Sequence, residues 1–250
     1  MADNTHLGHR QRLKARAAAH GFASLASHEQ VELLLCYAIP QGNVNPLAHT
    51  LINRFGSLAG ICTASRQELL EIDGIGEHTA TLLALVPGLV KAFLEAEAPT
   101  VKRFTSLGQL EDLLIRHYVG ETAETVCLLL FDGRMELLCM EELYRGSVSA
   151  VTASVRSIAE RVIRYNAAAV VLAHNHPGGL AVPSGEDLCS TRQLITSLNL
   201  LGISLIEHIL VAGNRAIPLL MHDNCHGRLT EFANFDAKRF YANSDAEEQG

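Results

Sequence analysis

The chain has 250 residues, of which 48% are hydrophobic; this is enough to bury a core and excludes a wholly disordered protein. The formal net charge of −7 excludes binding of nucleic acid through an overall positive charge, although a local basic patch is still compatible with it. The sequence shows no apolar signal-peptide core, and we expect no membrane-spanning stretch, so we predict a cytoplasmic protein without membrane contact. Its six cysteines are then expected to be reduced.

Residues 6–95 are predicted to form a bundle of short helices. Apolar residues recur there at helical spacing, as in EQVELLLCYAI and TATLLALVPGLVKAFL. Ser27 and Ser65 each precede acidic residues, which is typical of helix starts. Residues 96–104 interrupt the pattern with a proline between charged residues, so we expect a linker there and a helical domain over residues 1–98.

Residues 72–80, IDGIGEHTA, are similar to a helix-hairpin-helix. In that motif a glycine turn lets backbone N–H groups at a helix start bind a DNA phosphate without reading sequence. A plain tight turn between packed helices explains the same residues. Residues 1–95 hold seven basic and eight acidic side chains, a net charge of −1, and only residues 10–16 form a basic cluster. We therefore expect at most weak, sequence-independent DNA contact through residues 10–16 and 72–80.

From residue 105 onward, strands and helices alternate. The sequence predicts helices over 106–118, 154–166 and 184–201, and strands over 125–131, 135–144, 147–151, 167–173, 204–212 and 215–220. This order is typical of an α/β (α+β) fold, with a mixed sheet flanked by helices after the N-terminal helical bundle. Residues 223–250 are expected to be a polar tail, with at most a short element near 232–240.

The segment 169–187, AVVLAHNHPGGLAVPSGED, carries the candidate chemistry. His174 and His176 follow a buried strand at positions i and i+2, so in extended chain their imidazoles point the same way. Ser184 and Asp187 begin the next helix. Two imidazoles and one carboxylate are a usual ligand set for catalytic zinc, with the fourth position left to water. A packing role for the histidines and a capping box for Ser184 and Asp187 are the alternatives.

The spacing H-x-H, seven residues, S-x-x-D resembles the JAMM metalloprotease signature position for position. Residues 8–219 resemble the RadC family of bacterial proteins, in GHRQRLKAR, AAAVVLAHNHPGG and LLGISLIEHILVAG. The resemblance implies an MPN/JAB-type fold for residues 102–222. It also implies Zn²⁺ held by His174, His176 and Asp187, and hydrolysis of a peptide or isopeptide substrate by metal-activated water, with a link to DNA repair.

The resemblance further implies an upstream glutamate as general base. Glu124, in ETVCLLLFD, fits best; Glu121 is a near alternative, and Glu141 or Glu142 is the choice if the alignment is wrong. A solvated charge at a strand start explains Glu124 equally simply. Ser184 is expected to donate a hydrogen bond to the oxyanion that develops on the substrate carbonyl.

The chain departs from the family pattern at three places. Val155–Arg156–Ser157 replaces a Pro-Arg-Glu run, Gly179 stands where a serine is usual, and Glu207 replaces the aspartate before His208. None removes a ligand. We interpret His208 as a strand histidine that at most contacts a ligand. A second hypothesis therefore stays open: a DNA-associated protein whose metal site is structural or vestigial.

Overall fold

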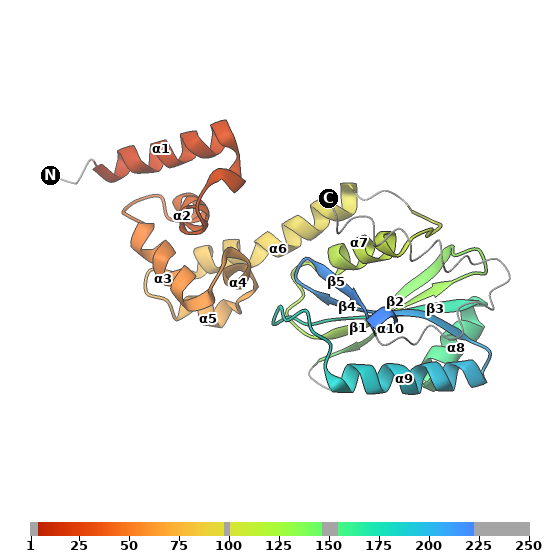
Figure 1. Cartoon of the computed structure of the whole chain (residues 1–250). Coiled ribbons are helices and arrows are strands. Elements are labelled where there is room, and N and C mark those ends of the chain that lie inside the picture. The colour runs from red at the N-terminus through yellow and green to blue at the C-terminus, as the bar shows by residue number, and fades with distance from the viewer. Residues whose placement is uncertain (1–4, 98–100, 147–154, 223–250) are drawn as a thin grey trace. The chain divides into compact units, whose positions relative to one another are not determined.

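The computed structural model describes residues 5–97, 101–146 and 155–222 (Figure 1). The predicted strand over 147–151 and the predicted polar tail with its element near 232–240 lie outside these residues. The chain separates into two compact units, Met1–Phe93 and Leu94–Gly250. Each unit is described by itself.

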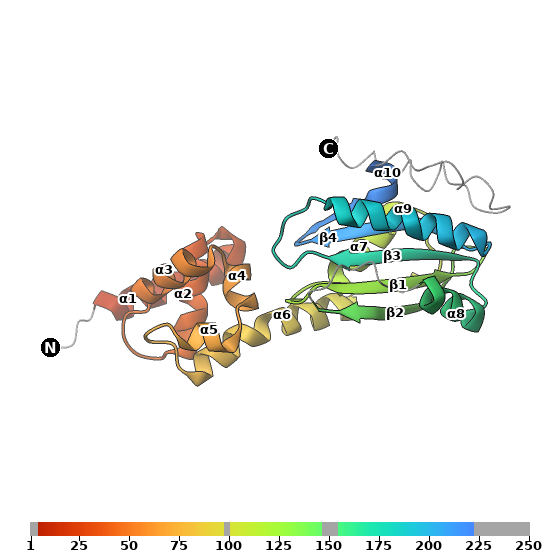
Figure 2. The same ribbon diagram turned by 90° about the horizontal axis from the view of Figure 1, so that it is seen from below.

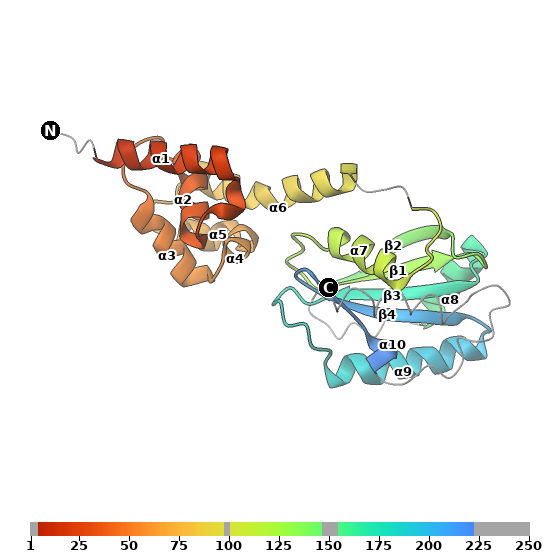
Figure 3. The ribbon, with the colours of Figure 1, turned by 45° about the horizontal axis from the view of Figure 1, so that its top comes forward.

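The N-terminal unit is helical, as the sequence predicts (Figures 1 and 3). Its elements are α1 (Thr5–His20), the short 3-10 helix η1 (Phe22–Ser24), α2 (Ser27–Ala38), α3 (Asn45–Phe55), α4 (Leu58–Thr63), α5 (Arg66–Leu70) and α6 (Glu77–Glu97). Apolar side chains from α2 to α6 share one buried core, which includes Val31, Leu35, Leu51, Ile61, Leu69 and Leu83. Ser65 caps α5 as predicted, because its hydroxyl accepts a hydrogen bond from the Glu68 N–H.

A tight turn that contains Gly74 joins α5 and α6. Gly74 has φ +93°, a conformation that glycine adopts without strain. The Ile75 N–H donates to the Ile72 carbonyl, and the Ala80 N–H to the Gly76 carbonyl, so the chain enters α6 directly after the turn.

Helix α6 bears on the expectation that the chain has no membrane-spanning stretch. It is long and apolar enough, by length and composition alone, to cross a membrane. A single such helix is weak evidence, because core helices of soluble proteins pass the same test. The first turns of α6 bury Thr79, Ala80 and Leu83, and the latter two belong to the core of the N-terminal unit.

The C-terminal unit is built on a five-stranded mixed sheet in the order β2-β1-β3-β4-β5. Figure 2 shows β2, β1, β3 and β4 side by side. The strands are β1 (Thr125–Phe131), β2 (Leu137–Arg145), β3 (Ala169–Asn175), β4 (Ser204–Ala212) and β5 (Arg215–Pro218). Only β3 and β4 run parallel among the pairs of this sheet. The predicted fold class is therefore confirmed.

Several predicted boundaries in this unit differ from the structure by one or two residues, and two of the differences bear on the site or on the end of the sheet. Strand β3 continues to Asn175, so His174 lies inside the strand rather than after it. The predicted strand over 215–220 ends at Pro218, and Leu219–His222 forms the short helix α10.

Helices cover both faces of the sheet (Figures 1 and 3). Helix α7 (Leu107–His117) packs against one face, and α8 (Val155–Tyr165) with α9 (Gly185–Leu200) packs against the other. Alternate residues of β1 separate accordingly: Leu129 belongs to the α7 side and Leu128 to the α8–α9 side. Burial on both faces explains why β1 and β3 read as continuous apolar runs.

The β3–β4 pair contains a one-residue register irregularity. Val170 lies opposite Leu205, but Val171 lies opposite Glu207 and Leu172 opposite His208, so Ile206 is the extra residue. In a regular strand, residues three apart point to opposite faces. The irregularity therefore puts Leu205 and His208 on the same face of the sheet, the face that α9 covers.

Candidate metal centre

Strand β3 positions both histidines. His174 is fully buried and lies opposite Leu210 of β4. One residue beyond the strand, the His176 N–H still donates to the Val211 carbonyl at 2.8 Å, so the chain stays extended and the two rings lie on one side, with centroids 5.1 Å apart. The chain then turns at Gly179, whose φ is +73° and whose N–H donates to the His176 carbonyl.

Asp187 reaches the same point from the start of α9. Ser184 is the N-cap of that helix, and its hydroxyl accepts a hydrogen bond from the Asp187 N–H at 3.1 Å. In return, Oδ2 of Asp187 accepts from the Ser184 N–H and from the Ser184 hydroxyl, both at 2.7 Å. The capping box is therefore real, and it is compatible with a ligand role, since Oδ1 of Asp187 is left to face His174.

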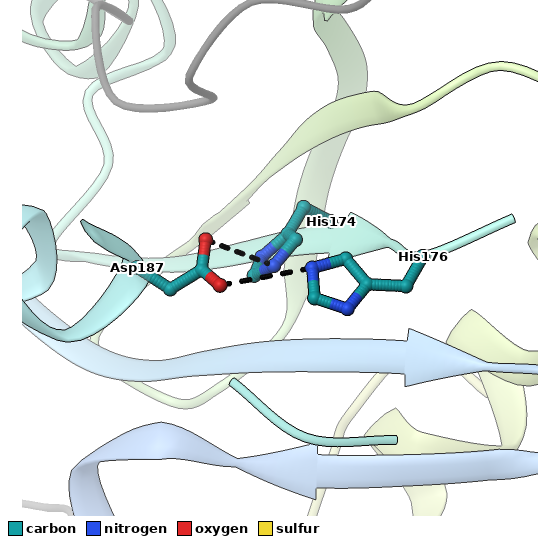
Figure 4. Close-up of side chains that lie close together, drawn as sticks. All are labelled: His174, His176 and Asp187. Carbon is teal, nitrogen blue, oxygen red and sulfur yellow. Dashed lines mark ion pairs between the residues drawn. The ribbon is translucent and has the colours of Figure 1, made fainter. Parts of the chain in front are cut away.

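The three side chains converge (Figure 4). The Asp187 carboxylate oxygens lie 3.4 Å from Nε2 of His174 and 3.6 Å from Nε2 of His176. Two ligands of one tetrahedral zinc ion, with bonds of about 2.0–2.1 Å, lie about 3.3–3.4 Å apart. One candidate donor atom from each residue lies within 4.8 Å of the other two. The spacing and the donor types fit a single metal ion.

The Nε2 atoms of both histidines face that point. Nδ1 of His176 lies 3.1 Å from the Leu180 carbonyl oxygen; a carbonyl only accepts, so Nδ1 carries the hydrogen and Nε2 the lone pair. Nε2 of His174 is buried and has no hydrogen-bond partner within the described part of the chain. A buried polar atom without a partner is costly, and a metal ion would satisfy it.

The electrostatics keep His174 neutral. Burial lowers the pKa of His174 to about 4, although the nearby Asp187 carboxylate acts in the opposite direction. Burial also lowers the pKa of His208 well below its usual value. A neutral imidazole is the form that binds a metal.

Glu124 lies immediately before β1, half-buried. Burial raises the pKa of Glu124, and the charges of His176, Asp187 and Glu186 also act on it. Glu124 is therefore electrostatically coupled to the histidine–aspartate cluster. Within the described residues its carboxylate makes no ion pair.

The alternative bases have arginine partners. Glu121 and Glu142 both form ion pairs with Arg145, at 2.9 and 2.8 Å. Glu141 accepts hydrogen bonds from Arg161 and from the Tyr165 hydroxyl, both at 2.7 Å. These pairs favour Glu124 as the carboxylate that is available for proton transfer.

Sequence reasoning missed Asn175. Its Oδ1 accepts from the Thr125 N–H at 2.7 Å and from the Thr125 hydroxyl at 2.9 Å, and its Nδ2 donates to the Ala123 carbonyl at 3.0 Å. These contacts hold the backbone on both sides of Glu124. The sequence shows Asn175 between two histidines. Its hydrogen-bond partners, Thr125 and Ala123, lie about fifty residues earlier, and only the pairing of β1 with β3 brings them close.

One of the family departures, Glu207, has a structural account. Oε1 of Glu207 accepts from the N–H groups of His208 and Leu220 at 2.9 and 2.8 Å, so the longer glutamate ties β4 to α10. His208 contacts a ligand directly: its Nε2 lies 2.9 Å from Nδ1 of His174. Arg156 is exposed and pairs with Glu160 four residues later.

Comparison with known proteins agrees with this geometry. The family described as "RadC-like JAB domain" matches residues 104–223. A UPF0758 protein of Ralstonia pickettii is 32% identical over 212 residues, which cover 85% of this chain and 95% of that protein. One from Bordetella bronchiseptica is 34% identical over 211 residues, 82% of this chain and 92% of that protein. One from Fusobacterium nucleatum is 32% identical over 227 residues, which cover 88% of this chain and 98% of that protein.

The chain belongs to the RadC family. The matched residues contain the whole five-stranded sheet, both histidines and Asp187. The relatives span nearly the length of this chain, so the helical unit is part of what they share with it. Their names state a family and no reaction, and the function of this RadC-family chain is therefore argued from its site.

The Asn175 contacts generate a first prediction. Asn175→Ala leaves the buried Thr125 N–H without its partner, which should cost about 1–3 kcal/mol in the free energy of unfolding. Urea denaturation of the metal-free protein measures this. Asn175→Asp keeps the acceptor for Thr125 but sets a buried carboxylate oxygen against the Ala123 carbonyl oxygen, so its loss should be larger. Equal losses for the two variants would contradict the assigned contacts.

The buried imidazoles generate a second prediction. The unfolded chain binds protons on His174 and His208 below pH about 6.5, whereas the folded metal-free chain holds them neutral down to lower pH. Stability should therefore fall as the pH drops from about 6.5 towards 4. The midpoint of urea unfolding, measured with a chelator present, should decrease across this window. His208→Gln should flatten the dependence, and His78→Gln, at an exposed position, should leave it unchanged.

Proposed function

We propose that this protein is a zinc-dependent hydrolase that cuts peptide or isopeptide bonds. One observation carries the proposal: three ligand atoms from β3 and α9 converge, and one of them, the buried Nε2 of His174, has no hydrogen-bond partner in the described part of the chain. Two imidazole nitrogens and one carboxylate oxygen are a set that catalytic zinc uses. When bound, zinc would make water nucleophilic near neutral pH and polarise a carbonyl oxygen.

The site is open on one side. The side chain of His174 is fully buried, whereas that of His176 is 23% exposed. The segment between His176 and Ser184 carries two exposed apolar side chains, Leu180 and Val182, which are 74% and 68% exposed to solvent. The Leu180 carbonyl oxygen lies 3.1 Å from Nδ1 of His176, so a polypeptide substrate that enters beside His176 would pass this apolar segment.

Glu124 and Ser184 have separate roles in the proposed reaction. Glu124 takes a proton from the attacking water as its oxygen bonds to the amide carbon. The same carboxyl group then gives that proton to the amine nitrogen when the C–N bond breaks. The Ser184 hydroxyl now donates to Asp187; to stabilise the developing oxyanion it would exchange that acceptor for the substrate oxygen.

A third prediction tests Glu124. Glu124→Gln removes the proton acceptor and keeps all three ligands, so the protein should still hold one zinc per chain with a near wild-type melting temperature. Hydrolysis should fall by about 10²–10⁴-fold, the usual contribution of a positioned general base. Metal analysis and turnover of a substrate selected from peptide and isopeptide libraries measure the two effects.

Glu121→Gln is the matched control, since Glu121 pairs with Arg145, and it should keep turnover. Asp187→Ala should lose both the metal and some stability, because it removes a ligand and the carboxylate of the capping box. Full activity of Glu124→Gln would place the base elsewhere. Equal metal content in wild type and in His174→Ala/His176→Ala would overturn the ligand assignment. Zinc-loaded wild type that cuts no amide would favour a structural metal site.

DNA contact by the N-terminal unit is a second, weaker proposal. The glycine turn at Gly74 leads directly into α6, as phosphate binding by a hairpin requires. The nearby charges work against it. Glu77 occupies the start of α6 and pairs with Arg66, Arg16 pairs with Glu29, and Arg10 donates to backbone carbonyls of its own unit.

A fourth prediction follows from this arrangement. The full chain should bind duplex DNA weakly, with an affinity that falls as salt rises. Glu77→Gln should tighten binding, since it removes a negative charge from the helix start. Glu95→Gln removes the same charge near the other end of α6 and should change little. Fluorescence anisotropy at low salt measures all three, and a flat curve for wild type and Glu77→Gln would leave the helices as a docking module for another protein.

A further inference from the structure

A buried chain of polar side chains runs behind the candidate metal centre. Nδ1 of His174 lies 2.9 Å from Nε2 of His208, and Nδ1 of His208 lies 2.6 Å from the Thr191 hydroxyl oxygen. That hydroxyl lies 2.6 Å from the backbone carbonyl oxygen of Asp187. The three side chains are all nearly inaccessible to solvent, at 0%, 2% and 5% exposure. The chain joins β3, β4 and α9, and it begins and ends at residues of the cluster.

The direction of each hydrogen bond follows from the Thr191 end. A hydroxyl has one hydrogen, and the Asp187 carbonyl only accepts. The Thr191 hydroxyl oxygen and the Asp187 carbonyl oxygen lie 2.6 Å apart and would repel without a hydrogen between them. The Thr191 hydroxyl therefore donates its hydrogen to the Asp187 carbonyl. The same oxygen must then accept from His208, and Nδ1 of His208 carries the hydrogen.

The direction of the hydrogen bond between His208 and His174 follows from the tautomer of His208. His208 is buried beside another imidazole, which favours its neutral form, and a neutral imidazole has one donor and one acceptor. Since Nδ1 of His208 donates, its Nε2 accepts, and Nδ1 of His174 donates to it. The lone pair of His174 is therefore on Nε2, the atom 3.4 Å from Asp187.

We propose that His208 and Thr191 are positioning residues that fix His174 as the Nδ1–H tautomer before any metal arrives, so that its Nε2 is preset as a ligand. Histidine ligands commonly need such a partner on the other ring nitrogen. Here the partner is a second imidazole, whose own tautomer is set by a helix hydroxyl. The relay also returns to the backbone of Asp187, so the ligands from β3 and α9 are held by one set of contacts. The metal role rests on the proposed function, whereas the tautomer does not.

The first test reads the tautomer directly. In the metal-free full chain with ¹⁵N-labelled histidine, long-range ¹H–¹⁵N correlation at neutral pH should show both His174 and His208 protonated on Nδ1 and bare on Nε2. The His174 signals are assigned from their loss in His174→Asn. A hydrogen on Nε2 of His174 would overturn the proposal, because Thr191 would then donate to His208 and the order would run the other way.

The second test measures zinc affinity by competition with a chromophoric chelator. Thr191→Val removes the acceptor for Nδ1–H of His208, so His208 can instead carry its hydrogen on Nε2 and donate it to His174. Zinc affinity should then fall by about 10–100-fold, as it does when other partners of metal ligands are removed. Thr191→Ser keeps the hydroxyl and should bind like wild type. His208→Leu should weaken binding, and His208→Gln, whose amide oxygen can accept from His174, should restore most of it.

Circular dichroism at the titration temperature separates this result from unfolding. Folded Thr191→Val and His208→Leu with wild-type affinity would overturn the positioning role. Failure of the proposed function and failure of the tautomer proposal can be told apart. A wild-type chain that binds no zinc contradicts the proposed function, and the tautomer measured in the metal-free chain then still tests the relay. Zinc binding with the opposite tautomer contradicts the relay alone.

Discussion

The capping box at the start of α9 is the interaction on which the candidate centre depends. A helix start leaves backbone N–H groups without partners, and here Ser184 and Asp187 satisfy each other's N–H groups. The same contact uses one oxygen of the Asp187 carboxylate and aims the other at His174. Local helix energetics and the geometry of the site are therefore set by one pair of residues. A change that loosens the helix start also moves a ligand.

The sequence could bring the candidate ligands together because the motif is local. His174, His176 and Asp187 fall within one strand, one turn and one helix start, and each of these elements has a short-range signature. The boundaries of β1 and β4 were readable for a similar reason, since apolar runs end there at turn residues. The end of β3 was not, because His174 and Asn175 look like loop residues. They remain in the strand since β4 pairs with both of them and β1 pairs with His174.

Contacts between distant segments account for what the sequence did not predict. Asn175 acts on Thr125 fifty residues earlier, and the start of α10 depends on Glu207 of β4. The linear charge count of the N-terminal unit also leaves out contacts between distant residues. It treats every arginine as available to a ligand, whereas Arg16 and Arg66 are already paired with Glu29 and Glu77. Composition limits what a surface can attract, but only the fold shows which charges are already neutralised.

The register irregularity between β3 and β4 has a consequence for folding. A β4 strand that paired with β3 one residue out of step would turn His208 away from Thr191 of α9 and towards the apolar α7 face. The imidazole would then be buried without the partners it has in the native sheet, and burying such a group is costly. His208 therefore disfavours the misaligned sheet. With an apolar residue in its place, the two strand alignments would differ less in free energy.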